Sequence, residues 1–336
     1  MAVGIWSAVG GVAAALGPPI GGLLVEGDWR WIFLVNIPVG IGAFVAARAF
    51  LPEIREPSGS ARPDGISALV FAGSIALLTA GIVQGPEWGW GDARVIGAFV
   101  GAAVGLAGFV WRSSNHPAPV IELPLLRIRP VAVGNAAAMA FFAGFAAMLL
   151  GAVLFLTEVW GYSIVTAGLA IAPGPLTAAI TAAPAGKLAA RYGPRLPAVA
   201  GGLAFAASFA WCLAVIGAEP AYVTQWLPGF LLGGLGVGLT LPSLPTAATA
   251  PLPPSRFATG TAVFAMSRQI GSAIGVAIFI AIIGDATGPA LLDAMRNAWW
   301  FTLGTGLAAA GLAMALPGTT ADLLAAKVVE PEPVAT

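Results

Sequence analysis

Long apolar stretches separated by short polar segments fill most of this 336-residue chain. A helix needs about 20 apolar residues to cross the hydrocarbon core of a bilayer. By that measure the pattern predicts ten membrane-spanning helices, at residues 3–25, 31–51, 64–84, 94–112, 131–157, 163–186, 196–217, 222–248, 257–284 and 297–317. The pattern therefore favours an all-α membrane protein with about ten transmembrane helices.

The composition agrees with this interpretation and excludes several classes of function. The chain is 58% hydrophobic and only 9% charged, whereas soluble domains are about 25% charged. The sequence shows no phosphate-binding loop, no metal-ligand cluster and no nucleophile beside a base, so we expect neither an enzyme nor a cofactor. The net charge is zero, and the basic residues follow the loops, so we expect no binding to nucleic acid.

The basic residues predict the orientation of the helices. If residue 1 is cytoplasmic, 11 of the 15 Lys and Arg residues fall on the cytoplasmic side and one, Arg268, lies inside a helix. The remaining three, Arg30, Arg94 and Arg296, fall outside. Cytoplasmic loops of membrane proteins carry an excess of Lys and Arg. The distribution therefore predicts that both termini are cytoplasmic.

The first predicted helix contains the run 17–22, Gly-Pro-Pro-Ile-Gly-Gly. Ala13, Gly17 and Gly21 share one side of the helix, where a neighbouring backbone can approach closely. Pro18 removes a backbone donor in mid-span, which neighbours must compensate. With Gly22, the run resembles the fifth-helix antiporter signature of drug exporters in the major facilitator superfamily, whose usual leading glycine is Ala13 here. The alternative is a packing seam of small residues in another membrane protein.

Other segments resemble one branch of that superfamily, the fourteen-helix drug:proton antiporters of the EmrB/QacA type. Residues 29–40 are similar to the start of its sixth helix, although they also suit a purely structural staple. Residues 64–112 supply the extra helix pair that twelve-helix members lack. Residues 116–130 are similar to the segment that leads into the C-terminal half, and residues 161–169 to the first outer turn of that half.

Residues 184–195 resemble the second copy of the superfamily's cytoplasmic loop signature. Gly186 permits close packing, while Lys187, Arg191 and Arg195 face the negative inner leaflet and the C-terminal carbonyls of their helix. The acidic partner that this signature usually has is absent, so we expect no gating salt bridge on this side.

Arg268 lies about 11 residues into its helix, which is near the bilayer midplane. Burying arginine there costs roughly 2.5–3.5 kcal/mol, so we expect its guanidinium to point into the bundle and to hydrogen-bond protein groups. Its surroundings, with Gln269 beside it, resemble the penultimate-helix signature of the EmrB/QacA type. A direct role in transport and a structural role on the carbonyls of a neighbouring helix both remain open. We place Gln269 and Asn135 in the same transport path.

Glu158 is the one carboxylate predicted near the outer end of a spanning helix, the fifth in the chain. It is a candidate for coupling to protons. The alternative is a carboxylate at the membrane interface that is simply exposed to water.

The resemblance implies a division of the chain into six parts. These are the last two helices of an N-terminal half (1–51), a cytoplasmic linker (52–63), an extra helix pair (64–112), an amphipathic cytoplasmic linker (113–130), a six-helix C-terminal half (131–317) and a cytoplasmic tail (318–336). A fourteen-helix member has four helices before the run at 17–22, so by this resemblance we expect an N-terminally truncated bundle.

The resemblance also implies a function. We expect a secondary transporter in the cell membrane that exports hydrophobic or cationic small molecules, with the proton gradient as its energy source and with the lipid bilayer and the substrate as its partners. One alternative is a truncated protein that inserts poorly, does not transport, or serves as an interaction partner. Another is a facilitator-type transporter of a different small metabolite. The sequence leaves the oligomeric state open.

Overall fold

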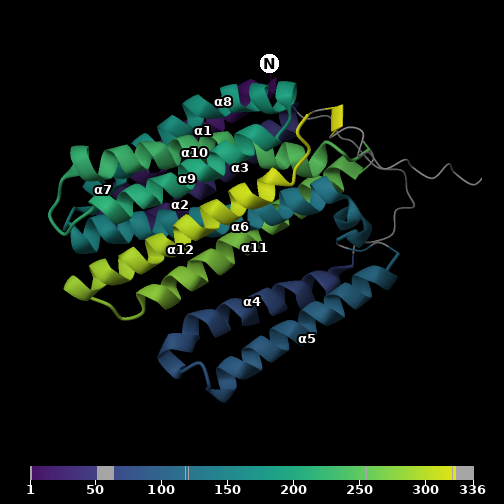
Figure 1. The fold of residues 1–336 in the computed structure, drawn as a ribbon, viewed down its shortest axis with the longest axis horizontal. Helices are drawn as coiled ribbons and strands as arrows, with labels where there is room; N and C mark the ends of the chain where they lie inside the picture. Colours follow the sequence, from purple (N-terminus) through teal and green to yellow (C-terminus); the bar gives the residue numbers. More distant parts are fainter. Residues whose placement is uncertain are drawn as a thin grey trace, which may run out of the picture.

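The computed structural model describes residues 2–50, 64–117, 119, 121–253, 256–319 and 321–322. All regular elements in these residues are helices, and no strand occurs among them (Figure 1). The prediction of an all-α bundle is therefore confirmed. The predicted linker 52–63 and most of the predicted tail lie outside the described residues.

The helices follow the predicted spans closely. They are α1 (Ala2–Gly27), α2 (Trp31–Leu34), α3 (Asn36–Phe50), α4 (Gly65–Trp88), α5 (Ala93–Asn115), the 3₁₀ helix η1 (Leu123–Arg127), α6 (Arg129–Leu154), the π-helical turn η2 (Phe155–Val159), α7 (Ile164–Ile171), α8 (Pro173–Tyr192), α9 (Arg195–Val215), the π-helical turn η3 (Tyr222–Trp226), α10 (Leu227–Thr249), α11 (Phe257–Ile283) and α12 (Pro289–Met314). Each predicted span coincides with one helix or with consecutive helices. Eight of these segments are long and apolar enough to cross a membrane, and α1 and α12 are not among the eight.

Proline explains where one of the predicted spans is divided. Pro173 has no backbone N–H to donate to the preceding turn, and the helix is interrupted at Ala172, after which α8 begins. The two helices still act as one membrane segment, Ile164–Tyr192.

Helix α6 lies at the centre of the bundle and packs against α10, α11 and α12 (Figure 1). Helix α9 packs against both α10 and α12. Glycine allows α6 and α11 to approach backbone to backbone. A Cβ atom on Gly271 would collide with the carbonyl of Met139, and one on Gly275 with the carbonyl of Ala143. Without a hydrophobic driving force in lipid, such close packing holds membrane helices together.

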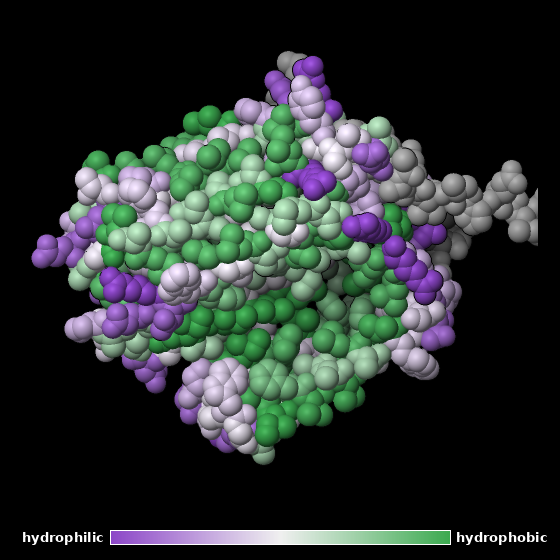
Figure 2. Space-filling view, viewed as in Figure 1, coloured by the Kyte–Doolittle hydropathy of each residue, from purple (hydrophilic) through white to green (hydrophobic). Residues whose placement is uncertain are grey.

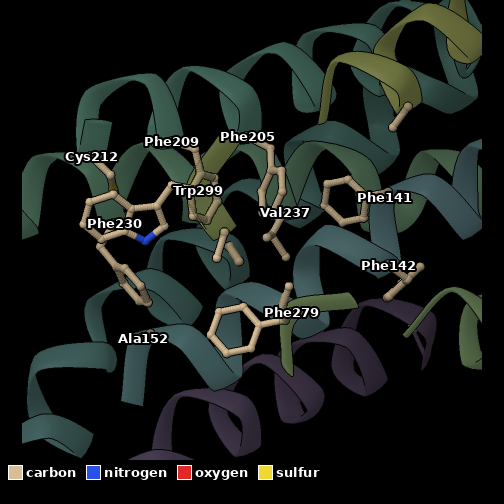
Figure 3. Close-up of a cluster of buried hydrophobic side chains, with 14 of the residues drawn as sticks. Phe141, Phe142, Ala152, Phe205, Phe209, Cys212, Phe230, Val237, Phe279 and Trp299 are labelled. Carbon is tan, nitrogen blue, oxygen red and sulfur yellow. The ribbon is translucent and has the colours of Figure 1, made fainter. Parts of the chain in front are cut away.

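The interior of the bundle is filled by aromatic rings. Phe141, Phe205 and Phe279 are fully buried, and Figure 3 shows them between the helices. The outside has the opposite pattern from a soluble protein. Figure 2 shows hydrophobic residues along the sides of the bundle and hydrophilic residues gathered mainly toward its two ends. This distribution suits a protein whose sides face lipid.

Two parts pack on the bundle from outside. Helix α1 lies against α7 and α8, and α3, which follows it, has no buried residue. The hairpin of α4 and α5 packs along α11, at the lower edge of Figure 1. Phe71 of α4 and Phe109 of α5 meet with ring centroids 4.7 Å apart. The proposed division into halves and linkers stays a prediction.

An ion pair with a buried carboxylate closes one end of the α4–α5 hairpin. Arg112 of α5 donates from Nε and Nη2 to the two oxygens of Asp64, at 2.6 and 3.0 Å. Asp64 also caps α4, because it accepts from the backbone N–H and the hydroxyl of Ser67. The side chain of Asp64 is only 2% exposed. The hydrogen bonds from Arg112 hold the pKa of this carboxyl well below its ordinary range.

We expect Asp64→Asn to loosen the hairpin at neutral pH. A carboxyl whose pKa is lowered by folding adds stability above its ordinary pKa of about 3.9 and loses it as the pH falls further. The native hairpin should therefore weaken below about pH 4, and the variant should show no such acid transition. Hydrogen exchange of the first turn of α4, measured from about pH 3 to about pH 7, tests this expectation. This range lies on both sides of the ordinary pKa of an aspartate.

Asp92→Asn is the matched control. Asp92 caps α5 and pairs with Arg94 in the same manner, but the Arg94 side chain is 63% exposed. Exposed ion pairs contribute little to stability, so this change should leave exchange in α4 unaltered. Equal effects of the two substitutions would contradict the role of the buried pair.

Candidate functional site

A polar contact joins the first half of α6 to α11. The Nδ2 atom of Asn135 donates to the carbonyl of Val131 at 2.8 Å. The hydroxyl of Ser267 lies 2.9 Å from Asn135 Oδ1 and 3.0 Å from the carbonyl of Val263. Asn135 is 4% exposed and Ser267 is 8% exposed. The amide predicted to lie in the transport path thus finds its partners inside the protein.

Ser267 was missed by the sequence analysis, although a signal for it exists. It lies four residues before Gly271, on the side of α11 that packs against α6. A hydroxyl on a helix-packing stripe in a membrane is a usual partner for a polar group on the facing helix.

Arg268 is the residue after Ser267, and its guanidinium contacts an aromatic ring. Its side chain is exposed, and its guanidinium carbon lies 5.6 Å from the ring centroid of Phe142, on α6. This distance suits a cation–π contact. The predicted hydrogen bonds from Arg268 to protein oxygen atoms are absent from the described part of the chain, and the aromatic face takes their place. Gln269, beside it, is exposed as well.

The small-residue motif of α1 packs differently from the expectation. A Cβ atom added to Gly17 or Gly21 would meet no atom of another helix within 4 Å, and Ala13 is exposed. The contact lies on the adjacent stripe, where a Cβ on Gly168 of α7 would lie 2.5 Å from the carbonyl oxygen of Pro18. Gly22 lies one turn further along α1. A Cβ atom added to it would lie 3.1 Å from the carbonyl oxygen of Ile164 and 3.2 Å from the Cα atom of Val165.

The expected close approach therefore exists but involves Pro18 and Gly22. The physical reason is that consecutive residues of a helix point about 100° apart, so a glycine-rich run offers two neighbouring stripes. Only one of them meets α7.

The basic residues of the predicted cytoplasmic loop signature lie in the last two turns of α8 and at the start of α9. Lys187, Arg191 and Arg195 are exposed, and Arg191 rests on the ring of Tyr192 at 5.2 Å. Gly186 makes only an ordinary contact, 3.7 Å from Pro242. The helix ends at Gly193, whose φ of +92° is a conformation that suits glycine.

Glu158 lies at the far end of α6, in the π-helical turn η2. It is exposed, and the hydroxyl of Thr157 lies 3.3 Å from its Oε1. It borders a pocket of about 180 Å³ lined by Leu154, Ile283 and Leu291, among others. No group of three or more metal-ligating side chains occurs among the described residues.

The structure brings some candidates together and keeps others apart. The contacts Asn135–Ser267 and Phe142–Arg268 both join α6 to α11, and we call these four residues together the α6–α11 polar cluster. Glu158 follows Phe142 by 16 residues, which is roughly 24 Å along the helix at about 1.5 Å per residue. The carboxylate and the arginine are therefore not in contact.

Comparison with known proteins gives two kinds of match. The sequence profile of the Major Facilitator Superfamily matches residues 1–276 and, separately, residues 136–333. Among individual proteins, the tetracenomycin C resistance and export protein of Streptomyces glaucescens is 29% identical over 301 residues, which is 89% of this chain and 55% of that protein.

Two further relatives have similar coverage. The multidrug resistance protein Stp of Mycobacterium tuberculosis is 32% identical over 84% of this chain and 52% of its own length. The probable actinorhodin transporter of Streptomyces coelicolor is 32% identical over 90% of this chain and 54% of its own length. The chain thus spans about half the length of the curated relatives that it matches.

Proposed function

Because the chain belongs to the major facilitator superfamily, a family of transporters and not of enzymes, we propose that the protein that carries it exports hydrophobic or cationic small molecules in exchange for protons. The names of the relatives support export, since they include antibiotic and multidrug resistance proteins. The eight helical segments that can cross a membrane supply the multi-pass scaffold.

The observation that carries this proposal is the α6–α11 polar cluster. Arg268 lies near the middle of an apolar helix, where its charge costs roughly 2.5–3.5 kcal/mol unless it faces a cavity or a partner. In the described residues its contact is the Phe142 ring, at 5.6 Å from the guanidinium carbon. An aromatic face beside an exposed cation suits a transport path for hydrophobic and cationic molecules, because the ring offers apolar contact and attracts positive charge.

We assign Arg268 an electrostatic role in coupling. Arginine does not lose its proton at physiological pH. It therefore acts by lowering the pKa of a carboxyl group that comes near it, either from the protein or from the substrate. A carboxylate that moves away from Arg268 during transport would bind a proton more readily. Glu158 remains a second candidate, at one end of the bundle.

The finer assignments belong to the same proposal. We assign the protein to the fourteen-helix EmrB/QacA type, with α4 and α5 as the extra pair and both termini in the cytoplasm. The excess of basic residues on one side supports this orientation.

One observation favours the alternative that these 336 residues alone do not transport. The segment Trp31–Phe50 is apolar and exposed along its whole length. Alternating access needs two bundles that rock around a shared site, and this segment packs on no such bundle here.

Dye efflux tests the proposal. The 336-residue chain and the longest natural reading frame that contains it would each be produced in a bacterial host without its own drug pumps. We expect proton-driven extrusion of a cationic dye from at least one of them, and the extrusion should stop when a protonophore collapses the gradient. Extrusion that survives the protonophore would contradict proton coupling. No extrusion by either protein, with normal insertion, would contradict drug export.

A further inference from the structure

The two π-helical turns bring a set of aromatic rings together at one end of the bundle. Phe155 begins η2 and Trp226 ends η3. Their rings are stacked, with centroids 5.5 Å apart and planes 4° from parallel. Trp299 of α12 packs on Phe155 at 5.3 Å. Turns of this kind are rare and occur often at functional sites.

Trp226 differs from other tryptophans of this region in its hydrogen bonding. Trp160 donates its indole N–H to the carbonyl of Gly217 at 3.0 Å, and Trp211 donates to the carbonyl of Gln225 at 2.9 Å. Trp226 is only 4% exposed, yet its Nε1 has no partner in the described part of the chain. A buried indole N–H normally has one.

Trp226 lines a small cavity of about 20 Å³ between α6, α9, α10, α11 and α12. Figure 3 shows three of its walls, Phe230, Cys212 and Trp299, close together. Two hydroxyl groups also line it, those of Ser208 and Thr302.

The two hydroxyls are able to complete a polar site. Ser208 is 3% exposed, and its hydroxyl makes no hydrogen bond within the described residues. The Thr302 hydroxyl donates to the carbonyl of Ala298 at 2.8 Å, which leaves its oxygen free to accept. One donor and two possible acceptors thus border the same space.

The size of the cavity decides what can occupy it. A water molecule needs about 10–15 Å³ of such volume and two to four polar partners. Pockets for drug-sized molecules are roughly 300–1,000 Å³. The cavity matches the first requirement and is far below the second.

We propose that this cavity is a binding site for one structural water. The water accepts from Trp226 Nε1 and donates to the hydroxyls of Ser208 and Thr302. It thereby links the start of α10 to α9 and α12, through a contact that does not require the helices to touch. This site is independent of the transport proposed above.

Nuclear magnetic resonance of the indole N–H groups tests the proposal directly. The full chain, labelled with ¹⁵N-tryptophan in lipid nanodiscs, has 11 indole groups, and the signal that disappears in Trp226→Phe identifies residue 226. We expect a cross-relaxation peak between that N–H and water. Trp160, which donates to a carbonyl, is the internal control and should show none. The absence of a water peak at Trp226, with Trp160 equally silent, would overturn the site.

A second experiment changes the melting temperature in opposite directions, depending on whether a water is bound to the Trp226 N–H or the N–H has no partner. Replacing Trp226 by benzothienylalanine exchanges its N–H for sulfur with almost no change of shape. If a water is bound, the change removes a hydrogen bond and the melting temperature should fall. If the N–H has no partner, the change removes an unpaired polar group and the melting temperature should rise.

Ser208→Ala provides the matched measurement on the other side of the cavity. With water bound, it should shift the Trp226 indole proton and weaken its water peak, while the Trp160 signal stays unchanged. An unaltered Trp226 signal would show that Ser208 is not a ligand of the water and would contradict the bridge to α9.

Discussion

Gly275→Val is expected to prevent stable folding of the helix bundle. A Cβ on Gly275 would collide with the carbonyl group and Cα of Ala143, all of them backbone atoms of α6. Overpacking costs about 1–3 kcal/mol when side chains can adjust. Here whole helices must separate, so we expect a cost of at least about 3 kcal/mol, which lowers the ratio of folded to unfolded protein more than a hundredfold.

The measurement is the amount of monodisperse protein after extraction in mild detergent, together with its melting temperature. Gly304→Val is the matched control, because Gly304 on α12 is exposed and a Cβ there has no neighbour within 4 Å. The control should give nearly the native yield. Equal yields and melting temperatures for both variants would show that the α6–α11 contact does not hold the bundle.

Arg268→Ala is expected to reduce proton-coupled efflux at least about tenfold, which is the kinetic equivalent of about 1.4 kcal/mol. The variant loses the only charge of the α6–α11 polar cluster and its contact with the Phe142 ring. Insertion should not suffer, because removing a charge from mid-membrane lowers the cost of insertion. The assay is the initial rate of dye extrusion under an imposed pH gradient, in the longest reading frame that contains these residues.

Two further variants separate charge from shape. Arg268→Lys keeps the charge and should retain part of the rate, whereas Arg268→Gln keeps a long polar side chain without the charge and should lose about as much as Arg268→Ala. Efflux at the native rate in Arg268→Ala would leave this residue only a structural role.

The positions of the helices could be predicted from sequence because bilayer thickness imposes a length on every apolar run. All ten predicted spans contain helix, and α9, predicted at 196–217, occupies Arg195–Val215. The break between α7 and α8 was missed, since several prolines in this chain lie inside helices that continue through them. Whether a proline divides a helix depends on the neighbours that satisfy the freed carbonyl groups.

The partners of the helices could not be predicted in the same way. The run at 17–22 offers two adjacent stripes of small residues, and only the fold shows that Pro18 and Gly22 meet α7. Arg268 was correctly placed as a mid-helix charge, but the ring that it meets belongs to a helix far earlier in the sequence. Contacts between residues so far apart in the sequence depend on how the helices pack in three dimensions. A single sequence does not show that packing.

The Asn135–Ser267 contact has a consequence for biosynthesis. The two residues are 132 positions apart, and ribosomes add roughly 5–20 residues per second. Asn135 therefore enters the translocon on the order of ten seconds before its partner is made. Its bond to the carbonyl of Val131, only four residues away, forms as soon as the helix does. One N–H of the amide thus has a partner during the wait, while the oxygen gains its partner only when α11 arrives.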